Sequence, residues 1–476
     1  MGRIVYLSFP AQGHVNPTLP VIRELAGRGE EISYFGTERF SSAIRQTGAN
    51  FCPYSERVHM PDQGPGPFAQ VSTTLETLLE FCGAVLDEHL DAVRKLRPTH
   101  VMMDSFAPWG RMVAQLLKLP AIVSVPSILI NRAIDARYGA GPELMPEDPR
   151  LTAEWCAWFG ARCHSRLLGY RLPEPVSPPQ LLQTYGDLNL VYTSRLFQPM
   201  EECFDEQRFQ FVGPCCAFRP DPPPFPFERL DDRPLVLVSL GTVYGRRTDF
   251  LRRCMEELAY GPWQVVIATG GDSNVGNTPG DTAGDAPGGT SRDTRRDSAG
   301  DAAPPNIIVR SSVPQVEILR RAAAFVTHGG MNSVQEALYY GVPLVMAPQA
   351  ADQFWISERT AELGAGMVLD ASRLKPGDIR TSVARALSGL GYASAAARIA
   401  QSLHSAGGHT KAADEILAFM EFPDGNARRR GSDRRDSDGK DSDGKDSVVR
   451  GKCSAARGKA GAGCSLAKRQ NAGALG

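Results

Sequence analysis

The segment from Thr327 to Ser333 has the residue types of a phosphate-binding turn, with the sequence Thr-His-Gly-Gly-Met-Asn-Ser. Two adjacent glycines let a backbone turn tightly and approach a ligand, and Asn332 or Ser333 could cap a following helix. The N-terminus of such a helix offers N–H groups and the positive end of its dipole, which favour a diphosphate. His328 could add a hydrogen bond to the same group. Taken alone, the turn fits a phosphate site and an ordinary α/β connection equally well.

Amide and carboxylate side chains surround this turn in an ordered series. Gln315 precedes it, Glu336 lies one helical turn beyond Ser333, and Asp352 and Gln353 follow. Carboxylates and amides suit vicinal hydroxyls because they accept and donate hydrogen bonds in pairs. Each member of this series fits a different part of a nucleotide sugar: a base edge, the diphosphate, the ribose hydroxyls and then the sugar hydroxyls. The segment therefore indicates a nucleotide-sugar site.

His14 and Asp104 are candidates for acid–base chemistry, because His14 lies in the turn after the first expected strand and Asp104 directly follows the strand expected at 100–103. A hydroxyl nucleophile needs a base within hydrogen-bond reach, and loops at the carboxyl ends of parallel strands are where α/β folds bind ligands. Each residue also has a purely structural interpretation. His14 could bond a local carbonyl in its turn, and Asp104 could cap the next helix. The residues alone do not place the two in contact.

The elements that must position these residues alternate between strand and helix in two blocks. In the first block, strands are expected at 4–8, 32–35, 100–103 and 121–124, and helices from Pro17, at 38–46 and at 109–117. In the second, strands are expected at 235–240, 264–268, 307–309, 324–327 and 344–347, and helices at 249–259, 316–321 and 333–340. Such alternation predicts parallel sheets covered by helices on both faces, that is, two doubly wound Rossmann-like units of the α/β class.

Length and composition shifts set the expected domain limits, because 476 residues are too many for one ordinary core. The prolines at 214–234 predict a semi-rigid linker. Gly270 to Pro305 has almost no large apolar side chains and is expected to be a disordered insertion. The expected parts are an N-terminal domain at 1–213, the linker, a C-terminal domain at 235–405, a helix at 406–422 and a disordered basic tail at 423–476. A solvated tail is favoured over an interaction arm.

Charge, cysteines and hydropathy exclude several classes of protein. A formal net charge of -1 gives no overall field for nucleic acid or anionic membrane. The ten cysteines include no CxxC pair, so reduced thiols, a cytoplasmic location and no metal site are expected. The most apolar stretch, 119–130, is short and holds two prolines, and the N-terminus lacks the features of a signal peptide. No transmembrane segment and no nucleic-acid partner are expected.

The segment from about 313 to 353 closely resembles the donor-binding signature of the UDP-glycosyltransferase superfamily (family 1 glycosyltransferases). The bacterial macrolide and natural-product glycosyltransferases are the nearest branch. Ser8 to Pro17 is similar to the opening turn of the family, and Ser239 to Thr242 is similar to its first C-domain loop. Only the insertion and the tail fall outside the resemblance. It implies the GT-B fold, in which two Rossmann-like domains face each other across a cleft, with the acceptor on the N-terminal domain and the nucleotide sugar on the C-terminal one.

The resemblance also implies a role for each matched residue of the donor site. Gln315 and the backbone beside it would contact uracil, and Glu336 would hold the ribose. The diphosphate would be held by Thr242, His328, Gly330, Asn332 and Ser333. Asp352 and Gln353 would hold hydroxyls of the transferred sugar. Ser312 stands where many relatives place an aromatic residue that stacks on the base, and loss of that stacking costs on the order of 1–3 kcal/mol.

The implied reaction is an inverting displacement in which His14 removes the proton of an acceptor hydroxyl. Asp104 would bond the histidine, fix its tautomer and stabilise the imidazolium. The leaving diphosphate would be stabilised by His328 and backbone N–H groups, without a metal or other cofactor. The Asp-Ser-Asp strings at 436–438 and 441–443 resemble metal-binding triplets but lie in tail repeats, and we interpret them as accidental.

The expected donor is UDP-glucose, and the expected acceptor is a hydrophobic small molecule such as a macrolide, flavonoid or other polyketide or phenolic. Phe68 to Leu90 and Pro126 to Trp158, with Tyr138, Trp155 and Trp158, could line an apolar crevice or equally be ordinary core. Two alternatives stay open at this point. One is a non-catalytic activating partner of another glycosyltransferase, and the other, less favoured, is a sugar-nucleotide epimerase of the same fold.

Overall fold

The computed structural model describes residues 2–59, 71–130, 160–163, 165–173, 178–241, 248–270, 304–350 and 352–421, with Ile134 and Ala157. The chain divides into two compact units, first between Phe218 and Arg219 and again between Ser405 and Ala406. The first division lies inside the stretch predicted as a linker. Most of the predicted insertion and the whole predicted tail lie outside the described residues.

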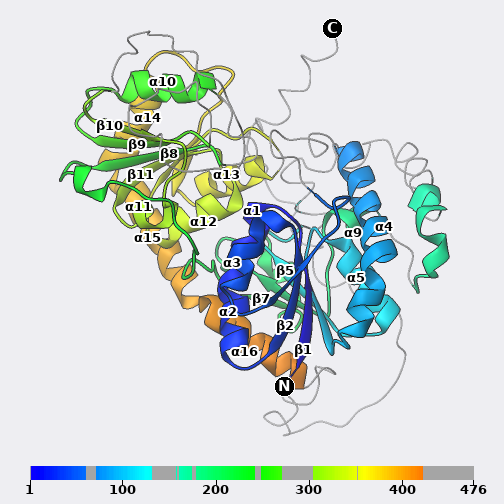
Figure 1. The fold of residues 1–476 in the computed structure, drawn as a ribbon. Coiled ribbons are helices and arrows are strands. Elements are labelled where there is room, and N and C mark those ends of the chain that lie inside the picture. The colour runs from blue at the N-terminus through cyan, green and yellow to red at the C-terminus, as the bar shows by residue number, and fades with distance from the viewer. Residues whose placement is uncertain are drawn as a thin grey trace, which may run out of the picture. The chain divides into compact units, whose positions relative to one another are not determined.

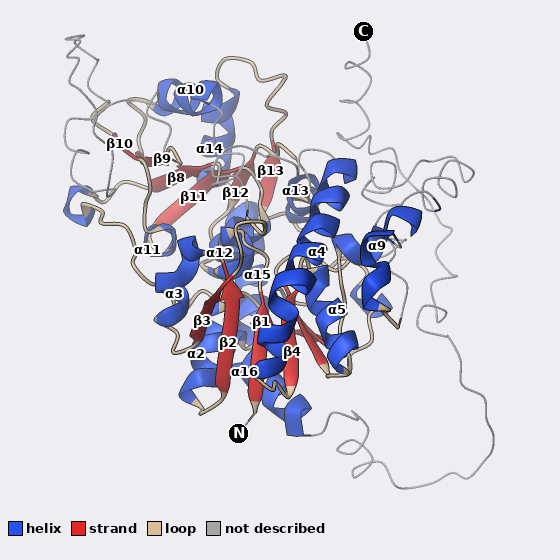
Figure 2. Cartoon of the chain, turned by 45° about the vertical axis from the view of Figure 1, so that its right-hand side comes forward, coloured by secondary structure: helices blue, strands red, loops and turns tan. Residues whose placement is uncertain are grey.

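The first unit is built on a seven-stranded parallel sheet in the order β3-β2-β1-β4-β5-β6-β7. Its strands are β1 (Arg3–Leu7), β2 (Glu31–Gly36), β3 (Asn50–Pro53), β4 (His100–Asp104), β5 (Ala121–Val125), β6 (Leu188–Val191) and β7 (Phe209–Phe211). Figure 2 shows β3, β2, β1 and β4 side by side. β1, β4 and β5 are almost wholly buried, as expected of strands covered on both faces.

Helices cover both faces of this sheet, as Figure 1 shows. The helices are α1 (Gln12–Val15), α2 (Leu19–Gly27), α3 (Ser41–Arg45), α4 (Val71–Lys95), α5 (Pro108–Leu117), α9 (Pro178–Leu182) and α16 (Gly408–Glu421). Single 3-10 turns occur at η1 (Glu38–Phe40), η3 (Leu168–Tyr170) and η4 (Glu201–Cys203). The helix predicted at 38–46 is therefore a 3-10 turn followed by a short α-helix.

The last helix of the described chain packs on the first unit. α16 lies beside α2, although nearly 400 residues separate them, and both contribute to one apolar cluster with the sheet. Ala412, Ala413 and Ile416 are its buried side chains. Arg28 and Asp414 form an exposed ion pair across the same two helices, with 2.5 Å between Nη1 and Oδ1. α16 is thus part of the core of this unit.

The second unit is built on a six-stranded parallel sheet in the order β10-β9-β8-β11-β12-β13. Its strands are β8 (Leu235–Ser239), β9 (Gln264–Ala268), β10 (Ile307–Arg310), β11 (Ala322–Thr327), β12 (Leu344–Met346) and β13 (Gly366–Val368). Its helices are α10 (Thr248–Leu258), α11 (Gln315–Leu319), α12 (Met331–Tyr339), α13 (Gln353–Glu362), α14 (Asp378–Ser388) and α15 (Leu390–Ser405), with a 3-10 turn η5 (Phe227–Arg229). This strand order is the Rossmann order.

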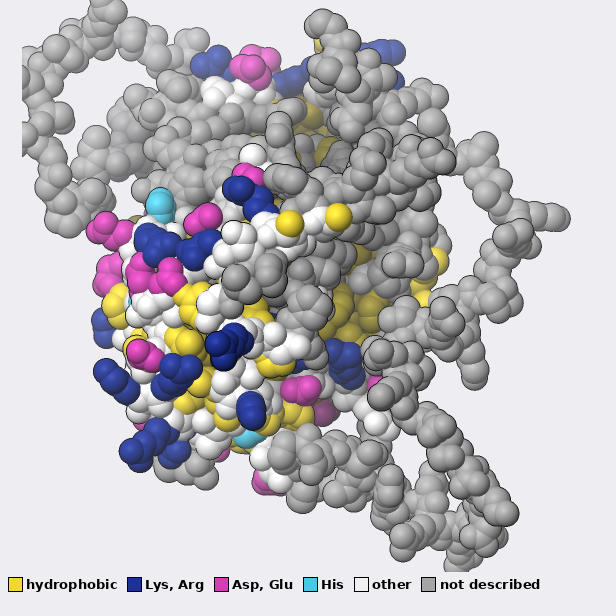
Figure 3. All heavy atoms as spheres, turned by 90° about the vertical axis from the view of Figure 1, so that its right-hand side faces the viewer, with side chains coloured by type: hydrophobic (Ala, Val, Ile, Leu, Met, Phe, Trp, Pro, Cys, Tyr) yellow, Lys and Arg dark blue, Asp and Glu magenta, His cyan; other side chains and the backbone are white. Residues whose placement is uncertain are grey.

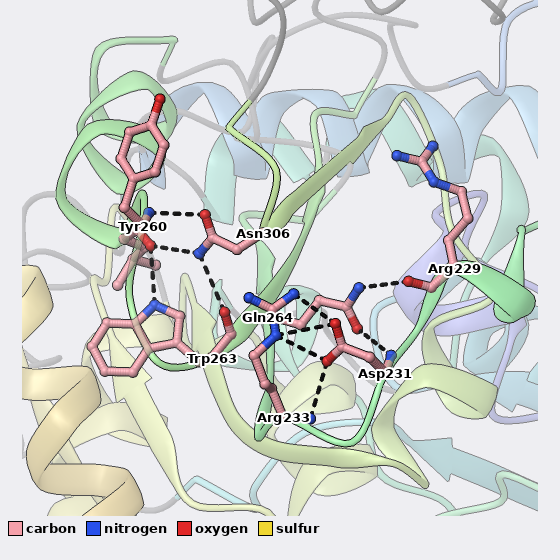
Figure 4. A network of polar contacts seen from close by, with 8 residues as sticks. Arg229, Asp231, Arg233, Tyr260, Trp263, Gln264 and Asn306 are labelled. Carbon is pink, nitrogen blue, oxygen red and sulfur yellow. Dashed lines mark hydrogen bonds and ion pairs between the residues drawn. The ribbon is translucent and has the colours of Figure 1, made fainter.

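Side-chain amides fix the entry of the chain into this second sheet, as Figure 4 shows. Gln264 donates to the carbonyl of Arg229 (2.7 Å) and accepts from the N–H of Asp231 (3.0 Å). Asn306 accepts from the N–H of Tyr260 (2.9 Å) and donates to the carbonyl of Trp263 (3.2 Å). These bonds satisfy backbone groups that the ladder does not use, so the end of the proline-rich stretch is ordered.

The surface shows mixed charge. On the face in Figure 3, Lys and Arg side chains lie among Asp and Glu side chains. Ion pairs at the surface of the described residues include Arg57 with Glu88 (2.7 Å) and Arg94 with Asp91 (2.9 Å). Within the described part of the chain, no helix has both the length and the apolar character needed to cross a bilayer.

Replacing Ile416 with Ala should destabilise the first unit by about 2–4 kcal/mol, because it removes buried methyl groups between α16 and the sheet. Hydrogen exchange read by mass spectrometry should become faster in β1 and β6 and stay unchanged in β8. Asp414→Ala, which removes only the surface ion pair, is the matched control and should change the free energy of unfolding by less than about 1 kcal/mol. Equal effects of the two substitutions would contradict this packing.

Candidate active site

The strand order of the first unit reverses between β1 and β4. At such a reversal the loops leave in opposite directions, and a crevice forms at the carboxyl ends of the two strands. Leu7 pairs with Met103 in the ladder, so the loop after β1 and the end of β4 start at the same level. His14 lies in the first of these loops, in α1, and Asp104 is the last residue of β4.

His14 and Asp104 are joined by a hydrogen bond of 2.9 Å between Nδ1 and Oδ1. The Asp104 side chain is fully buried, whereas that of His14 is 24% exposed. A carboxylate oxygen accepts hydrogen bonds, so Nδ1 is the donor in this contact and Nε2 is the ring nitrogen that the contact does not use. Oδ1 also accepts from the N–H of Phe106 at 2.7 Å, which holds the carboxylate in place. The pair has the arrangement of a base with an orienting carboxylate.

Neither structural interpretation accounts for the two side chains. The N-cap residue of α5 is Ala107, so Asp104 does not cap that helix. The ring of His14 instead packs against two aromatic rings, with centroid distances of 4.8 Å to Phe9 and 5.6 Å to Phe106, and these two rings also contact each other at 5.4 Å. These contacts restrict the orientation of the His14 ring, whose side chain stays 24% exposed.

Buried hydroxyl groups hold the turn that carries His14. Tyr54 donates to the carbonyl of Ser8 (3.1 Å) and accepts from the indole N–H of Trp109 (3.0 Å). Thr18 donates to the carbonyl of Val15 (2.8 Å), so the Tyr34 hydroxyl 3.1 Å away must donate to Thr18. Burial raises the pKa of both phenols, which stay protonated donors. These contacts could not be predicted from the sequence, because Tyr34, Tyr54 and Trp109 lie in separate segments of the chain.

The second unit repeats this arrangement. Its strand order reverses between β8 and β11, and Thr327 pairs with Ser239. The loops at 240–241 and 328–330 therefore leave neighbouring strands at the same level, in the crevice position. Thr242, predicted to contact the diphosphate, lies outside the described residues.

Three glycines make room for the side chains at this turn. A Cβ at Gly241 would lie 2.7 Å from Cε1 of His328, and one at Gly330 would collide with Nε2 of the same ring. Gly329 has a φ of +82°, which favours glycine, and a Cβ there would collide with the Ser357 hydroxyl. The His328 ring is thus held between two backbone segments. Desolvation lowers its pKa to about 4, so the ring is neutral at pH 7.

The helix after this turn begins at Met331, with Gly330 as its N-cap in an extended conformation and without a side-chain cap. The prediction that Asn332 or Ser333 caps the helix is wrong, because both residues lie inside its first turn. The N–H groups of that turn and the positive end of the dipole therefore point into the loop region without a capping side chain in front of them.

Glu336 is the centre of a polar cluster on the same helix. Its Oε1 accepts from Nη2 of Arg219 at 2.6 Å, and its Oε2 accepts from Nε2 of Gln315 at 2.7 Å. The Gln315 amide also lies 3.4 Å from the hydroxyl of Ser333. The structure thus brings together three of the predicted donor-site residues. Arg219, 117 positions away and at the edge of the proline-rich stretch, was not predicted.

Asp352 and Gln353 begin α13, in the connection that follows β12. Gln353 is buried, and its Oε1 accepts from the N–H groups of Gln349 (2.9 Å) and Ala350 (3.3 Å). It therefore holds the shape of the connecting loop, while Asp352 beside it is half-buried. Ser312 is exposed in the loop between β10 and α11.

The candidate acceptor region is only partly described. Tyr138, Trp155 and Trp158 lie outside the described residues. On α4, the side chains of Leu78 and Val85 are buried, and the Phe81 ring packs against Trp109 with 5.9 Å between centroids. In this helix those side chains belong to the core.

Sequence comparison identifies relatives over most of the chain. Residues 291–419 match the family described as Erythromycin biosynthesis protein CIII-like, C-terminal domain. An uncharacterized UDP-glucosyltransferase of Bacillus subtilis (strain 168) is 30% identical over 422 residues, which are 88% of this chain and 97% of that protein. The oleandomycin glycosyltransferase of Streptomyces antibioticus is 28% identical over 424 residues, covering 87% and 90% of the two chains.

Solved structures give the same result for the fold. The glycosyltransferase of kitacinnamycin superposes with a TM-score of 0.68 at 29% identity, covering 88% of this chain and 98% of that one. The calicheamicin glycosyltransferase CalG4 has the same TM-score at 27% identity, with 89% and 99% covered. The predicted GT-B fold, with its two Rossmann-like units, is confirmed. The chain belongs to the family 1 glycosyltransferases and is a glycosyltransferase of their macrolide and natural-product branch.

Proposed function

We propose that this enzyme transfers glucose from UDP-glucose to a hydroxyl group of a hydrophobic small molecule, with inversion at C1 and without a metal. The observation that carries the proposal is the hydrogen bond of 2.9 Å between His14 and the buried Asp104. It leaves Nε2 of a partly exposed imidazole as a base for the acceptor hydroxyl.

The proposed reaction is a single displacement. Nε2 of His14 takes the proton of the acceptor hydroxyl as its oxygen attacks C1 of the sugar, and the bond from C1 to the diphosphate breaks. Asp104 stabilises the imidazolium that forms, because its charge is buried and directly bonded to Nδ1. Attack from the face opposite the leaving group inverts C1.

The donor half of the proposal rests on the second unit. The uncapped first turn of α12 offers backbone N–H groups to the diphosphate, and the neutral His328 ring can donate one further hydrogen bond. Gln315 and Glu336 lie together where the resemblance expects the nucleoside. Asp352 and Gln353 are proposed to bind hydroxyls of the sugar. The loop contacts of Gln353 use its Oε1, so the proposed contact of this residue with the sugar is through Nε2.

The acceptor class is proposed from the relatives. The names of two of them describe transfer to demethyllactenocin (30% identical over 414 residues, Streptomyces fradiae) and to oleandomycin.

The acceptor class can be tested by incubating the enzyme with UDP-glucose and a panel of macrolide, flavonoid and phenolic acceptors. Mass spectrometry should detect a product heavier than its acceptor by about 162 Da, the mass of an anhydrohexose unit, both with and without EDTA. UDP binding without a product from any acceptor would instead support a non-catalytic partner, and loss of product in EDTA would contradict the metal-free step.

Replacing His14 with Ala should lower kcat by about 10²- to 10⁴-fold, because no other group takes the acceptor proton. Asp104→Asn should also lower kcat, since the amide does not stabilise the imidazolium. UDP binding, measured by calorimetry, should be nearly unchanged in both variants. Transfer by the His14 variant at the wild-type rate would show that the base is a different group.

His328 should make the second unit sensitive to acid. Its folded pKa of about 4 is below the ordinary value of 6.5, so between these values the unfolded chain binds more protons than the folded one. The free energy of unfolding should therefore fall as the pH is lowered from 6.5 to 4, by up to roughly 3 kcal/mol.

His328→Gln removes this titration. Urea denaturation between pH 7 and 4 should show a smaller loss of stability in the variant than in the wild type, and other groups cancel in the comparison. Parallel pH profiles for the two proteins would mean that His328 is not held in its neutral form by burial.

A further inference from the structure

The carboxylate of Glu336 is satisfied by the protein itself. Oε1 is bonded to the guanidinium of Arg219 at 2.6 Å and Oε2 to the amide of Gln315 at 2.7 Å. The pair is shielded from solvent, since the side chains of Arg219 and Glu336 are 16% and 7% exposed. Glu336 therefore carries a paired charge and two hydrogen bonds before a nucleotide is bound.

This pairing determines how strongly the site can select a ribose. A binding site rejects a ligand that lacks a hydroxyl mainly when its own buried group is then left without a partner. Here the loss of a ribose hydroxyl leaves Glu336 still bonded to Arg219 and Gln315. Each carboxylate oxygen can accept a further hydrogen bond, so a ribose hydroxyl still binds but is not required.

We propose that Arg219 is a specificity-determining residue that makes the donor site tolerant of the nucleotide sugar, so that ribose and 2′-deoxyribose nucleoside diphosphates both bind. The inference rests on the proposed function, in which Glu336 faces the ribose. Arg219 acts through Glu336, as a positioning residue, and does not itself need to touch the nucleotide.

Arg219 has the larger part in this effect because it alone neutralises the charge. The Gln315 amide supplies a hydrogen bond but no charge, whereas a guanidinium bonded to a buried carboxylate makes the pair neutral. A neutral pair also avoids repulsion between Glu336 and the diphosphate. Without Arg219 the carboxylate keeps one neutral donor, and a ribose hydroxyl becomes its best additional partner.

The test compares UDP with 2′-deoxy-UDP, which differ by one hydroxyl, in calorimetric titrations of the full chain. In the wild type the ratio of the two Kd values should be about 2- to 10-fold, the effect of one additional hydrogen bond. In Arg219→Met the ratio should rise to about 10- to 100-fold, because the hydroxyl then pairs with an unneutralised charge. Arg219→Lys, which restores the charge, should bring the ratio back toward the wild-type value.

Arg253→Met is the matched control. Arg253 pairs with the half-buried Glu257 at 2.8 Å in the same unit, but on α10. Its loss should lower stability without moving the ratio, so a change in the ratio reports the Glu336 pair and not a weakened fold.

Each outcome decides the inference. A wild-type preference for UDP above about 100-fold would overturn it, and this result needs no variant to fold. A ratio that is the same in the wild type and in Arg219→Met would also overturn it, while UDP binding would leave the proposed donor site intact. If neither nucleotide binds the wild type, the donor site itself is misassigned and the inference fails with it.

Discussion

The hydrogen bond between His14 and the buried Asp104 is the interaction on which the proposed catalytic base depends. A buried carboxylate needs hydrogen-bond partners, and Oδ1 of Asp104 has two, the imidazole of His14 and the N–H of Phe106, while Oδ2 is buried without a hydrogen bond among the described residues. The fold supplies this contact because β1 and β4 are neighbours at the reversal of strand order. The surrounding aromatic rings and the hydroxyls of Tyr34 and Tyr54 then fix the turn, so the base is positioned before a substrate arrives.

The second unit has the same strand topology as the first, but its proposed ligand is the diphosphate of the donor. A diphosphate needs positive potential without a bulky side chain at the point of contact, and in the proposed donor site the N-terminus of α12, which has no side-chain cap and follows two glycines, would provide it. Desolvation lowers the pKa of His328 and keeps its ring neutral, so in the proposed site it would donate a hydrogen bond without carrying a full charge. The negative charge of Glu336 is balanced by Arg219, so in the proposed site the carboxylate would not repel the diphosphate of the donor.

Much of the fold could be predicted from the sequence, but short edge strands and contacts between distant residues could not. The strands at the centre of both sheets and the turn at 327–333 were predicted, because buried parallel strands are continuous apolar runs and the glycine turn has a local signature. β3, β7 and β13 are three or four residues long and lie at sheet edges, which leaves little periodicity to detect. The contacts of Asp104 with His14 and of Arg219 with Glu336 span 90 and 117 residues, so only the folded chain brings them together. The prediction that Asn332 or Ser333 caps α12 is wrong because the N-cap position, 330, lies against the His328 ring and has room only for glycine.

The measurement that tests this account most directly is the configuration of the product. A single displacement by a hydroxyl that His14 has deprotonated must invert C1, so UDP-α-glucose should give only the β-glucoside. The coupling of the anomeric proton in the NMR spectrum of the purified glycoside distinguishes the two configurations. A large coupling, typical of the β-anomer, is the predicted result. An α-glucoside would contradict the account, because retention requires a different chemical course from the one that the His14–Asp104 pair supports.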